Sequence, residues 1–163
     1  MIFVTVGTHE QPMNRLLQEL DRLIESKVIQ EEVIIQNGFS DFEVRGAKME
    51  QLLPFKEMQK NMEDARGIIT HGGAATYLQA LALGKVPVVV PRSFAYHEHV
   101  NDHQLEFAQK LVAVGYQLEI VEDMADLELA IKHVATLTGE TKSHNAEFNQ
   151  HFEEVVGELF NKG

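Results

Sequence analysis

Residues 67–91 read GIITHGGAATYLQALALGKVPVVVP, and this stretch decides the fold. A short β-branched run at 67–70 meets a glycine-rich turn, which opens an apolar helical stretch over 76–83. Gly84 stops that helix, and a second apolar run follows at 86–90. Continuous apolar runs of this kind are typical of strands buried on both faces. The stretch therefore predicts parallel strands covered by helices.

The same alternation of strands and helices extends over most of the chain. Further strands are expected at 2–6, 33–36 and 117–121, with short ones at 42–44 and 51–53. Further helices are expected at 12–24, 56–65, 101–112 and 125–137, and a final amphipathic helix carries Phe148, Phe152, Val155, Val156 and Leu159. That last apolar stripe can pack on its own domain or on a partner. The predicted fold class is α/β, a single doubly wound parallel sheet in one domain, 1–163.

Composition excludes several classes of function. The 163 residues carry a formal net charge of −11, which suits neither DNA nor RNA, so no nucleic acid is expected as a partner. The absence of cysteine excludes disulfides, thiolate metal sites and cysteine nucleophiles. The longest apolar run, 86–91, is too short to cross a bilayer, and no signal peptide precedes the first strand. We therefore expect a cytoplasmic protein.

Ligands of such sheets bind at the carboxyl ends of the strands, so the loops that follow strands are the places to look. In the loop 71–76, two glycines and two alanines let a backbone approach a ligand, and the next helix offers free amides that favour phosphate. The same glycines also suit a tight corner that binds nothing. Neither the dinucleotide fingerprint nor a Walker lysine is present.

A second polar loop, 92–104, contains Glu98, His99, Asn101, Asp102, His103 and Gln104. Three interpretations compete for it. The spacing of Asn101 and Gln104 fits a helix-capping box. The three histidines at 97, 99 and 103 could hold a metal ion. Amide, carboxylate and imidazole groups also suit sugar hydroxyls, and we favour this third interpretation, with Asn101 also capping the helix.

A third loop, 7–10, follows the first strand. His9 and Glu10 could act as a base and its orienting group, or they could form a solvated turn. Serine-triad chemistry has no support, because the G-x-S-x-G motif is absent.

Together, three blocks resemble a known family: VTVGTH at 4–9, HGGAAT at 71–76 with GKVPVVVPR at 84–92, and EHVNDHQ at 98–104. They are similar to the C-terminal, donor-binding domain of MurG-like glycosyltransferases, and most similar to its single-domain members. Those members are bacterial PssE/EpsF-type exopolysaccharide glycosyltransferase subunits and the catalytic subunit of the eukaryotic dolichol-linked N-acetylglucosaminyltransferase. The resemblance implies a Rossmann-like sheet that forms one half of a GT-B glycosyltransferase. It also implies that a separate, membrane-anchored chain supplies the acceptor-binding half.

The resemblance also assigns roles to residues. It implies diphosphate binding by Gly7, Thr8, Gly72, Gly73, Ala74, Ala75 and Thr76, uridine binding by Phe55, Met58 and Gln79, and sugar binding by Glu98, His99, Asn101, Asp102, His103 and Gln104. Gln79 departs from the glutamate of many relatives, and we expect its neutral amide to weaken ribose binding by roughly 1 kcal/mol. His9 is the candidate base in this chain, although the partner can also supply the base.

The implied reaction is inverting transfer of a hexose, galactose by resemblance, from a UDP-sugar to a lipid-linked saccharide acceptor in exopolysaccharide or capsule synthesis. No metal or other cofactor is implied, because helix amides can stabilise the leaving diphosphate. The chain is then expected at the inner face of the cell membrane, held there by its partner. Two alternatives stay open: transfer of N-acetylglucosamine or glucuronic acid in another glycolipid pathway, and a non-catalytic subunit that binds nucleotide sugars.

Overall fold

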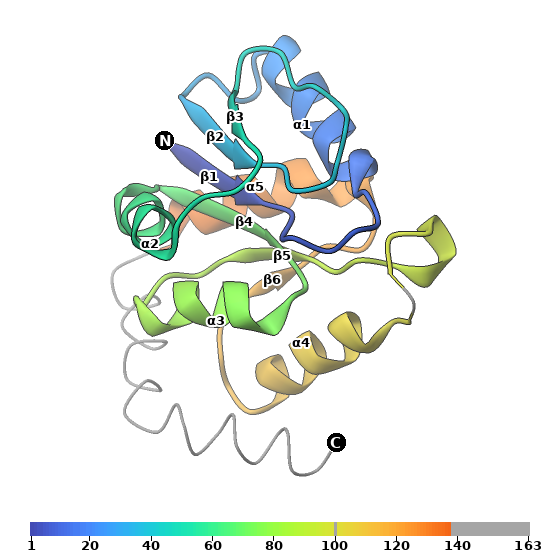
Figure 1. Ribbon diagram of the computed structural model, residues 1–163. Helices are drawn as coiled ribbons and strands as arrows, with labels where there is room; N and C mark the ends of the chain where they lie inside the picture. The colour runs from blue at the N-terminus through green and yellow to red at the C-terminus, as the bar shows by residue number, and fades with distance from the viewer. Residues whose placement is uncertain (100, 138–163) are drawn as a thin grey trace.

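The computed structural model describes residues 1–99 and 101–137, so the expected final helix lies outside the described residues. Six strands form one sheet in the order β3-β2-β1-β4-β5-β6, and every neighbouring pair is parallel (Figure 1). The strands are β1 (Ile2–Thr5), β2 (Val33–Gln36), β3 (Lys48–Glu50), β4 (Gly67–His71), β5 (Val88–Val90) and β6 (Glu119–Ile120). The chain starts in the middle of the sheet and winds outward in both directions. This confirms the predicted doubly wound fold.

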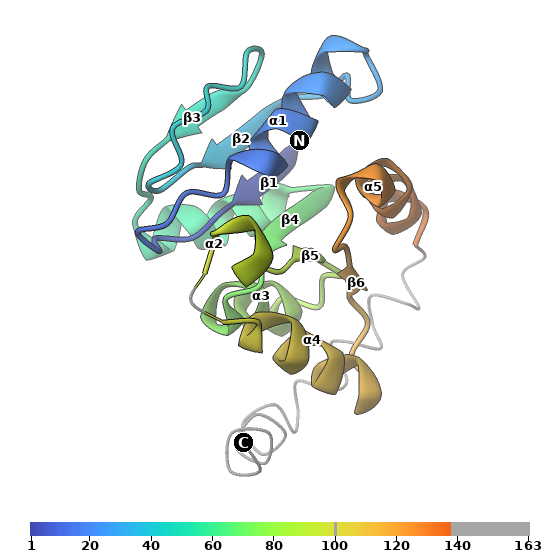
Figure 2. The same ribbon diagram turned by 90° about the vertical axis from the view of Figure 1, so that its right-hand side faces the viewer.

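Helices cover both faces of the sheet (Figure 2). One face is covered by α1 (Asn14–Glu25) and α5 (Leu127–Thr136). The other is covered by α2 (Phe55–Asp64), α3 (Ala74–Ala82) and α4 (His103–Ala113). Two short 3-10 turns, η1 (Phe94–Tyr96) and η2 (Met124–Asp126), follow β5 and β6. No helix among the described residues is long and apolar enough to cross a membrane.

The central strand β1 supplies side chains to both layers of the core, because successive residues of a strand point to opposite faces. Ile2 and Val4 join the cluster under α1 and α5, whereas Phe3 packs with Met62 of α2 and Ile68 of β4. All four residues of the strand are buried, as the apolar run predicted.

The edge of the sheet differs from the prediction. Residues 42–44 form no strand, and the edge strand covers 48–50 rather than 51–53. In this strand Met49 packs against the core between exposed Lys48 and Glu50, so no continuous apolar run marks it. Beyond the strand, Leu53 donates its N–H to Oε1 of Gln36 at 3.0 Å, a loop contact rather than a ladder bond.

Candidate functional site

The structure brings the three predicted polar loops together at the carboxyl edge of the sheet. Thr5 of β1 lies opposite Thr70 of β4, and His71 lies opposite Val90 of β5. The loops that follow β1, β4 and β5 therefore leave the sheet side by side. The first of them has Thr8 exposed at its tip.

His71, the last residue of β4, occupies the centre of this edge. Its Nδ1 accepts the N–H of Gly73 at 3.0 Å, and its Nε2 lies 3.3 Å from Oγ1 of Thr76. Burial, assisted by nearby Arg92, lowers the pKa of His71 to about 3. The ring is therefore neutral, and because Nδ1 accepts a hydrogen bond, its proton sits on Nε2.

The glycines of this edge make room for the protein's own side chains. A Cβ on Gly7 or on Gly73 would overlap the His71 ring. A Cβ on Gly72 would lie 2.7 Å from Cβ of Gln104. The expectation that these glycines open the backbone to a ligand is thus incomplete, because internal packing already requires each of them.

The N-terminus of α3 lies open beside His71. Gly73 is the N-cap and supplies no side chain, and its carbonyl accepts from the N–H groups of Thr76 and Tyr77. The N–H groups of Ala74 and Ala75 have no partner within residues 1–99 and 101–137. Two amides and the positive end of the helix dipole are therefore available to an anion.

Gln79 shares a face of α3 with Ala75, four residues before it. Its Nε2 is shielded from solvent and has no hydrogen-bond partner in the described part of the chain. Phe55, at the start of α2, also lies at the carboxyl edge with 66% of its surface exposed. Met58 is half-buried, and its side chain packs against the core beneath α2. Of the predicted uridine site, Phe55 has the more accessible side chain.

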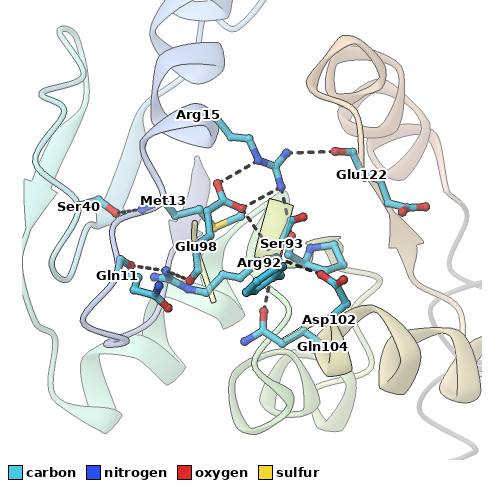
Figure 3. Close-up of polar contacts among 12 residues, drawn as sticks. Gln11, Met13, Arg15, Ser40, Arg92, Ser93, Glu98, Asp102, Gln104 and Glu122 are labelled. Carbon is cyan, nitrogen blue, oxygen red and sulfur yellow. Dashed lines mark hydrogen bonds and ion pairs between the residues drawn. The ribbon is translucent and has the colours of Figure 1, made fainter. Parts of the chain in front are cut away.

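Glu98 is buried and holds the loop after β5 from within (Figure 3). Its Oε2 accepts from Nε of Arg15 at 2.9 Å, and its Oε1 accepts from Nη2 of Arg15 and from the N–H of Ser93, both at 3.1 Å. Both carboxylate oxygens are thus occupied inside the protein. Glu98 therefore positions the loop, which differs from the expected contact with a sugar.

Arg92 joins the same loop to the loop after β1. The side chain is 1% exposed, and its guanidinium donates to the carbonyls of Val6, Gln11 and Glu98. Figure 3 shows Arg15 and Arg92 on either side of Glu98, reaching it from different elements. A buried guanidinium needs such a set of acceptors, because an unpaired buried charge is costly.

Three other predicted sugar-binding side chains also bond to backbone near the loop. Asp102, Asn101 and Gln104 accept, in that order, from the N–H groups of Phe94, His103 and Arg92 at 3.0, 3.0 and 2.9 Å. The N-cap of α4 is Asp102 and not Asn101, and its side chain makes no capping bond to the helix, so the expected capping role of Asn101 reduces to its contact with the N–H of His103. Gln104 does not complete a capping box, because its Oε1 is bound to β5's end rather than to the helix.

The imidazoles of His97 and His103 are exposed, whereas that of His99 is half-buried. His103 is exposed at the first position of α4, and His99 has a shielded Nδ1 with no partner among the described residues. A metal site in this loop is one of the alternatives that the sequence leaves open. Within 1–99 and 101–137, no three side chains of metal-binding type are gathered.

His9 packs against His99, with ring centroids 4.5 Å apart. Its Nδ1 accepts the N–H of Gln11 at 3.1 Å, so this amide orients the ring where Glu10 was expected to do so. Desolvation, followed by the proximity of His99 and Arg92, lowers the pKa of His9 below 6.5. The ring is neutral at pH 7, with its proton on Nε2.

Three residues of the site were not singled out from the sequence: Arg15, His71 and Arg92. Arg92 did carry a usable signal, because an arginine directly after a buried apolar strand must find partners for its charge. Arg15 carried none, since one arginine near the start of an amphipathic helix is ordinary.

The parallel sheet and its order are those of the Rossmann-like C-terminal half of GT-B glycosyltransferases. The kitacinnamycin glycotransferase has this fold with a TM-score of 0.70 and 16% identity, over 94% of this chain and 39% of that one. SnogD from Streptomyces nogalater matches with a TM-score of 0.64 and 19% identity, over 94% of this chain and 39% of that one. MurG of Acinetobacter baumannii matches with a TM-score of 0.59 and 18% identity, over 97% of this chain and 49% of that one. The chain thus spans less than half the length of each of these proteins.

Residues 1–159 match the glycosyltransferase family 28 C-terminal domain, and the chain belongs to this family. The predicted resemblance to the MurG-like C-terminal domain is confirmed, while the narrower subfamily stays a prediction. No curated protein sequence gives a significant match to the chain.

Proposed function

We propose that the chain is the catalytic, donor-binding subunit of a two-component inverting glycosyltransferase. It transfers a hexose, expected to be galactose, from a UDP-sugar to a lipid-linked acceptor in exopolysaccharide or capsule synthesis. The observation that carries the proposal is the N-terminus of α3, where the N–H groups of Ala74 and Ala75, one turn from Gln79, have no partner among the described residues. The family supplies the class of reaction, and this edge supplies a place for an anionic donor.

In the proposed reaction, the acceptor hydroxyl attacks the anomeric carbon as the bond to the diphosphate breaks. Negative charge then builds on the departing UDP. The N–H groups of Ala74 and Ala75 and the dipole of α3 stabilise that charge, and they need no reorganisation because the helix already fixes them. Thr76 adds a hydroxyl on the same turn.

The rest of the donor finds suitable groups around this helix. The exposed ring of Phe55 is available to stack on uracil, and Gln79 to bind the ribose hydroxyls. His99 and His103 are the candidates for the sugar, because their imidazoles are not used to build the loop. Glu98, Asn101, Asp102 and Gln104 hold the loop in shape and so position these two histidines.

The proposed reaction also needs an acceptor-binding half. Large apolar side chains are exposed after β2, β3 and β5, all at the carboxyl edge: Phe39, Leu52, Phe55, Phe94 and Tyr96. Val28, Val112, Val114 and Leu129 are exposed elsewhere, but the exposed aromatic side chains of the described residues all lie at this edge, which favours contact with a second body there. We propose that this body is a membrane-anchored subunit that holds the cytoplasmic donor subunit at the inner face of the membrane.

Titration of the full chain with UDP, with ADP and GDP as controls and EDTA present, tests the donor site. We expect the chain to bind UDP and to bind neither ADP nor GDP. Ala74→Pro removes one amide at a helix position that tolerates proline, and the preceding Gly73 is already extended, with ψ 118°. We expect this variant to bind UDP about tenfold more weakly without losing stability, whereas Ala74→Gly keeps the amide and the affinity. Equal affinity in both variants argues against the site.

A donor screen with the reconstituted pair separates the alternatives. Transfer from UDP-galactose supports the proposal, whereas transfer from UDP-N-acetylglucosamine or UDP-glucuronate favours the other glycolipid pathway. If the reconstituted pair binds UDP and transfers no sugar, the chain is a non-catalytic subunit that binds nucleotide sugars.

A further inference from the structure

His9, in the loop after β1, and His71, the last residue of the neighbouring strand β4, make the same kind of hydrogen bond. Nδ1 of His9 accepts the N–H of Gln11 at 3.1 Å, and Nδ1 of His71 accepts the N–H of Gly73 at 3.0 Å. In each case the donor is the backbone amide two residues further on. Because a neutral imidazole accepts at one nitrogen and donates at the other, both rings present Nε2–H.

The nitrogen that each ring presents has a different environment. Nε2 of His71 is directed to Thr76 at 3.3 Å, inside the protein. Nε2 of His9 has no partner within the described ranges, and its ring is half-buried rather than covered. The loop that carries His9 packs on His71 through Gly7, which places it beside the open amides of α3.

The surroundings of His9 oppose its use as a base. A base at this position becomes an imidazolium when it accepts the proton of the acceptor hydroxyl. That charge would form beside the Arg92 guanidinium and against the ring of His99, with Glu10 as the one nearby acid that favours it. It would also protonate Nδ1 and break the bond from Gln11.

We propose that His9 donates a hydrogen bond from Nε2–H to an anionic oxygen of the diphosphate instead of accepting a proton. This inference rests on the proposed function and adds a third neutral donor to the two amides of α3. The donor site then holds the diphosphate without a cation from His9. The proton of the acceptor hydroxyl passes to a base on the acceptor-binding half, while the new glycosidic bond forms and the bond between sugar and diphosphate breaks.

Two substitutions separate the nitrogens of the ring. His9→Asn keeps an acceptor where Nδ1 was, since an asparagine oxygen can accept the amide two residues on, but it does not reach the ligand. His9→Gln carries its amide N–H further out, where Nε2 was, and loses the bond to Gln11. The full chain and both variants are titrated with UDP, dTDP and inorganic pyrophosphate, with His133→Phe, on the exposed side of α5, as the matched control.

We expect His9→Asn to bind UDP and pyrophosphate about tenfold more weakly, and His9→Gln and His133→Phe to stay within about threefold of the wild type. A purely structural role for His9 gives the opposite order, with Asn tolerated and Gln impaired. A base gives no change in affinity for either variant. Both of these patterns overturn the inference.

The outcomes also separate this inference from the proposed function. Pyrophosphate binding that follows the expected order, without selectivity for UDP, overturns the uridine donor and supports the role of His9. Failure of UDP, dTDP and pyrophosphate alike overturns both. Nitrogen-15 NMR of histidine-labelled chain gives an independent reading: a proton on Nδ1 of His9 overturns the inference, and one on Nε2 supports it.

Discussion

Arg15 in α1 and Glu98 after β5 form a two-point ion pair, although they are 83 positions apart in the chain. The same guanidinium lies 4.5 Å from the centroid of the Tyr96 ring and donates to the carbonyls of Pro91 and Glu122. One side chain thus joins α1 to the ends of β5 and β6. The loop that carries the proposed sugar-facing histidines is thus held by a side chain of α1.

Removal of Arg15 should leave a buried carboxylate without its main partner. We expect Arg15→Met to lower the free energy of unfolding by about 3 kcal/mol, because one charge of a buried pair is then unpaired. Urea unfolding measures this change. The double variant Arg15→Met/Glu98→Gln should be more stable than Arg15→Met, and Arg22→Met, which breaks an exposed pair on the same helix, should leave the midpoint unchanged. A double variant no more stable than Arg15→Met contradicts this account.

A double-mutant cycle tests whether residue 73 is a glycine because the His71 ring needs the space beside it. Gly73 has an ordinary φ of −68°, so alanine is conformationally acceptable there, and the added methyl group meets the His71 ring. We expect Gly73→Ala to cost about 1 to 3 kcal/mol of unfolding free energy in the wild type, as overpacking does. In a His71→Ala background the same substitution should cost almost nothing. An equal cost in both backgrounds would show that the glycine is needed for another reason.

Stability should depend on pH through His71. Its pKa falls from 6.5 in the unfolded chain to about 3 in the fold. Below pH 6.5 the unfolded chain binds a proton that the folded chain refuses, so the stabilising contribution is complete above that value and is lost as the pH falls. The loss approaches about 1.4 kcal/mol per pH unit.

The variant His71→Asn isolates this effect, because its oxygen can still accept the N–H of Gly73 and it does not titrate. We expect the difference in unfolding free energy between wild type and variant to shrink by about 2 kcal/mol from pH ~7 to pH ~5. Urea titrations at the two values measure it. A difference that stays constant would mean that His71 is not held neutral by the fold.

Gln79 offers a test of the ribose site. Gln79→Glu replaces the neutral amide with a carboxylate, which accepts hydroxyl hydrogen bonds more strongly than an amide does. We expect UDP to bind roughly fivefold more tightly and pyrophosphate, which lacks a ribose, to gain nothing. Calorimetric titration of both ligands measures the two effects. A parallel change for UDP and pyrophosphate would place Gln79 near the phosphates instead.

The sheet and its helices were largely predictable. The strands β1, β2, β4 and β5 are buried on both faces, so each appears in the sequence as a continuous apolar run. The edge strand β3 was misplaced because burial of Met49 alone leaves no pattern to detect. Exposed edges make few demands on sequence, and their bounds follow from pairing with the neighbouring strand.

The position of the proposed site stays a prediction, and the contacts that its side chains make within the protein were not predictable. The glycine-rich turn before α3 and the polar loop after β5 were found from spacing and from the rule that ligands bind at the ends of parallel strands. Several of their side chains form hydrogen bonds within the protein. Asn101 and Asp102 bond within the loop, whereas Glu98 depends on an arginine of α1.

By itself, then, the sequence determined the alternation of strands and helices, the parallel sheet and the edge at which its polar loops meet. These properties follow from local patterns of burial and from backbone turns, which neighbouring residues encode. Tertiary structure alone decided that Arg15 meets Glu98, that His71 fills the space beside two glycines, and which nitrogen of His9 carries the proton. Each depends on a partner placed by the fold, and a hydrogen bond exists only where two groups lie within about 3 Å of each other.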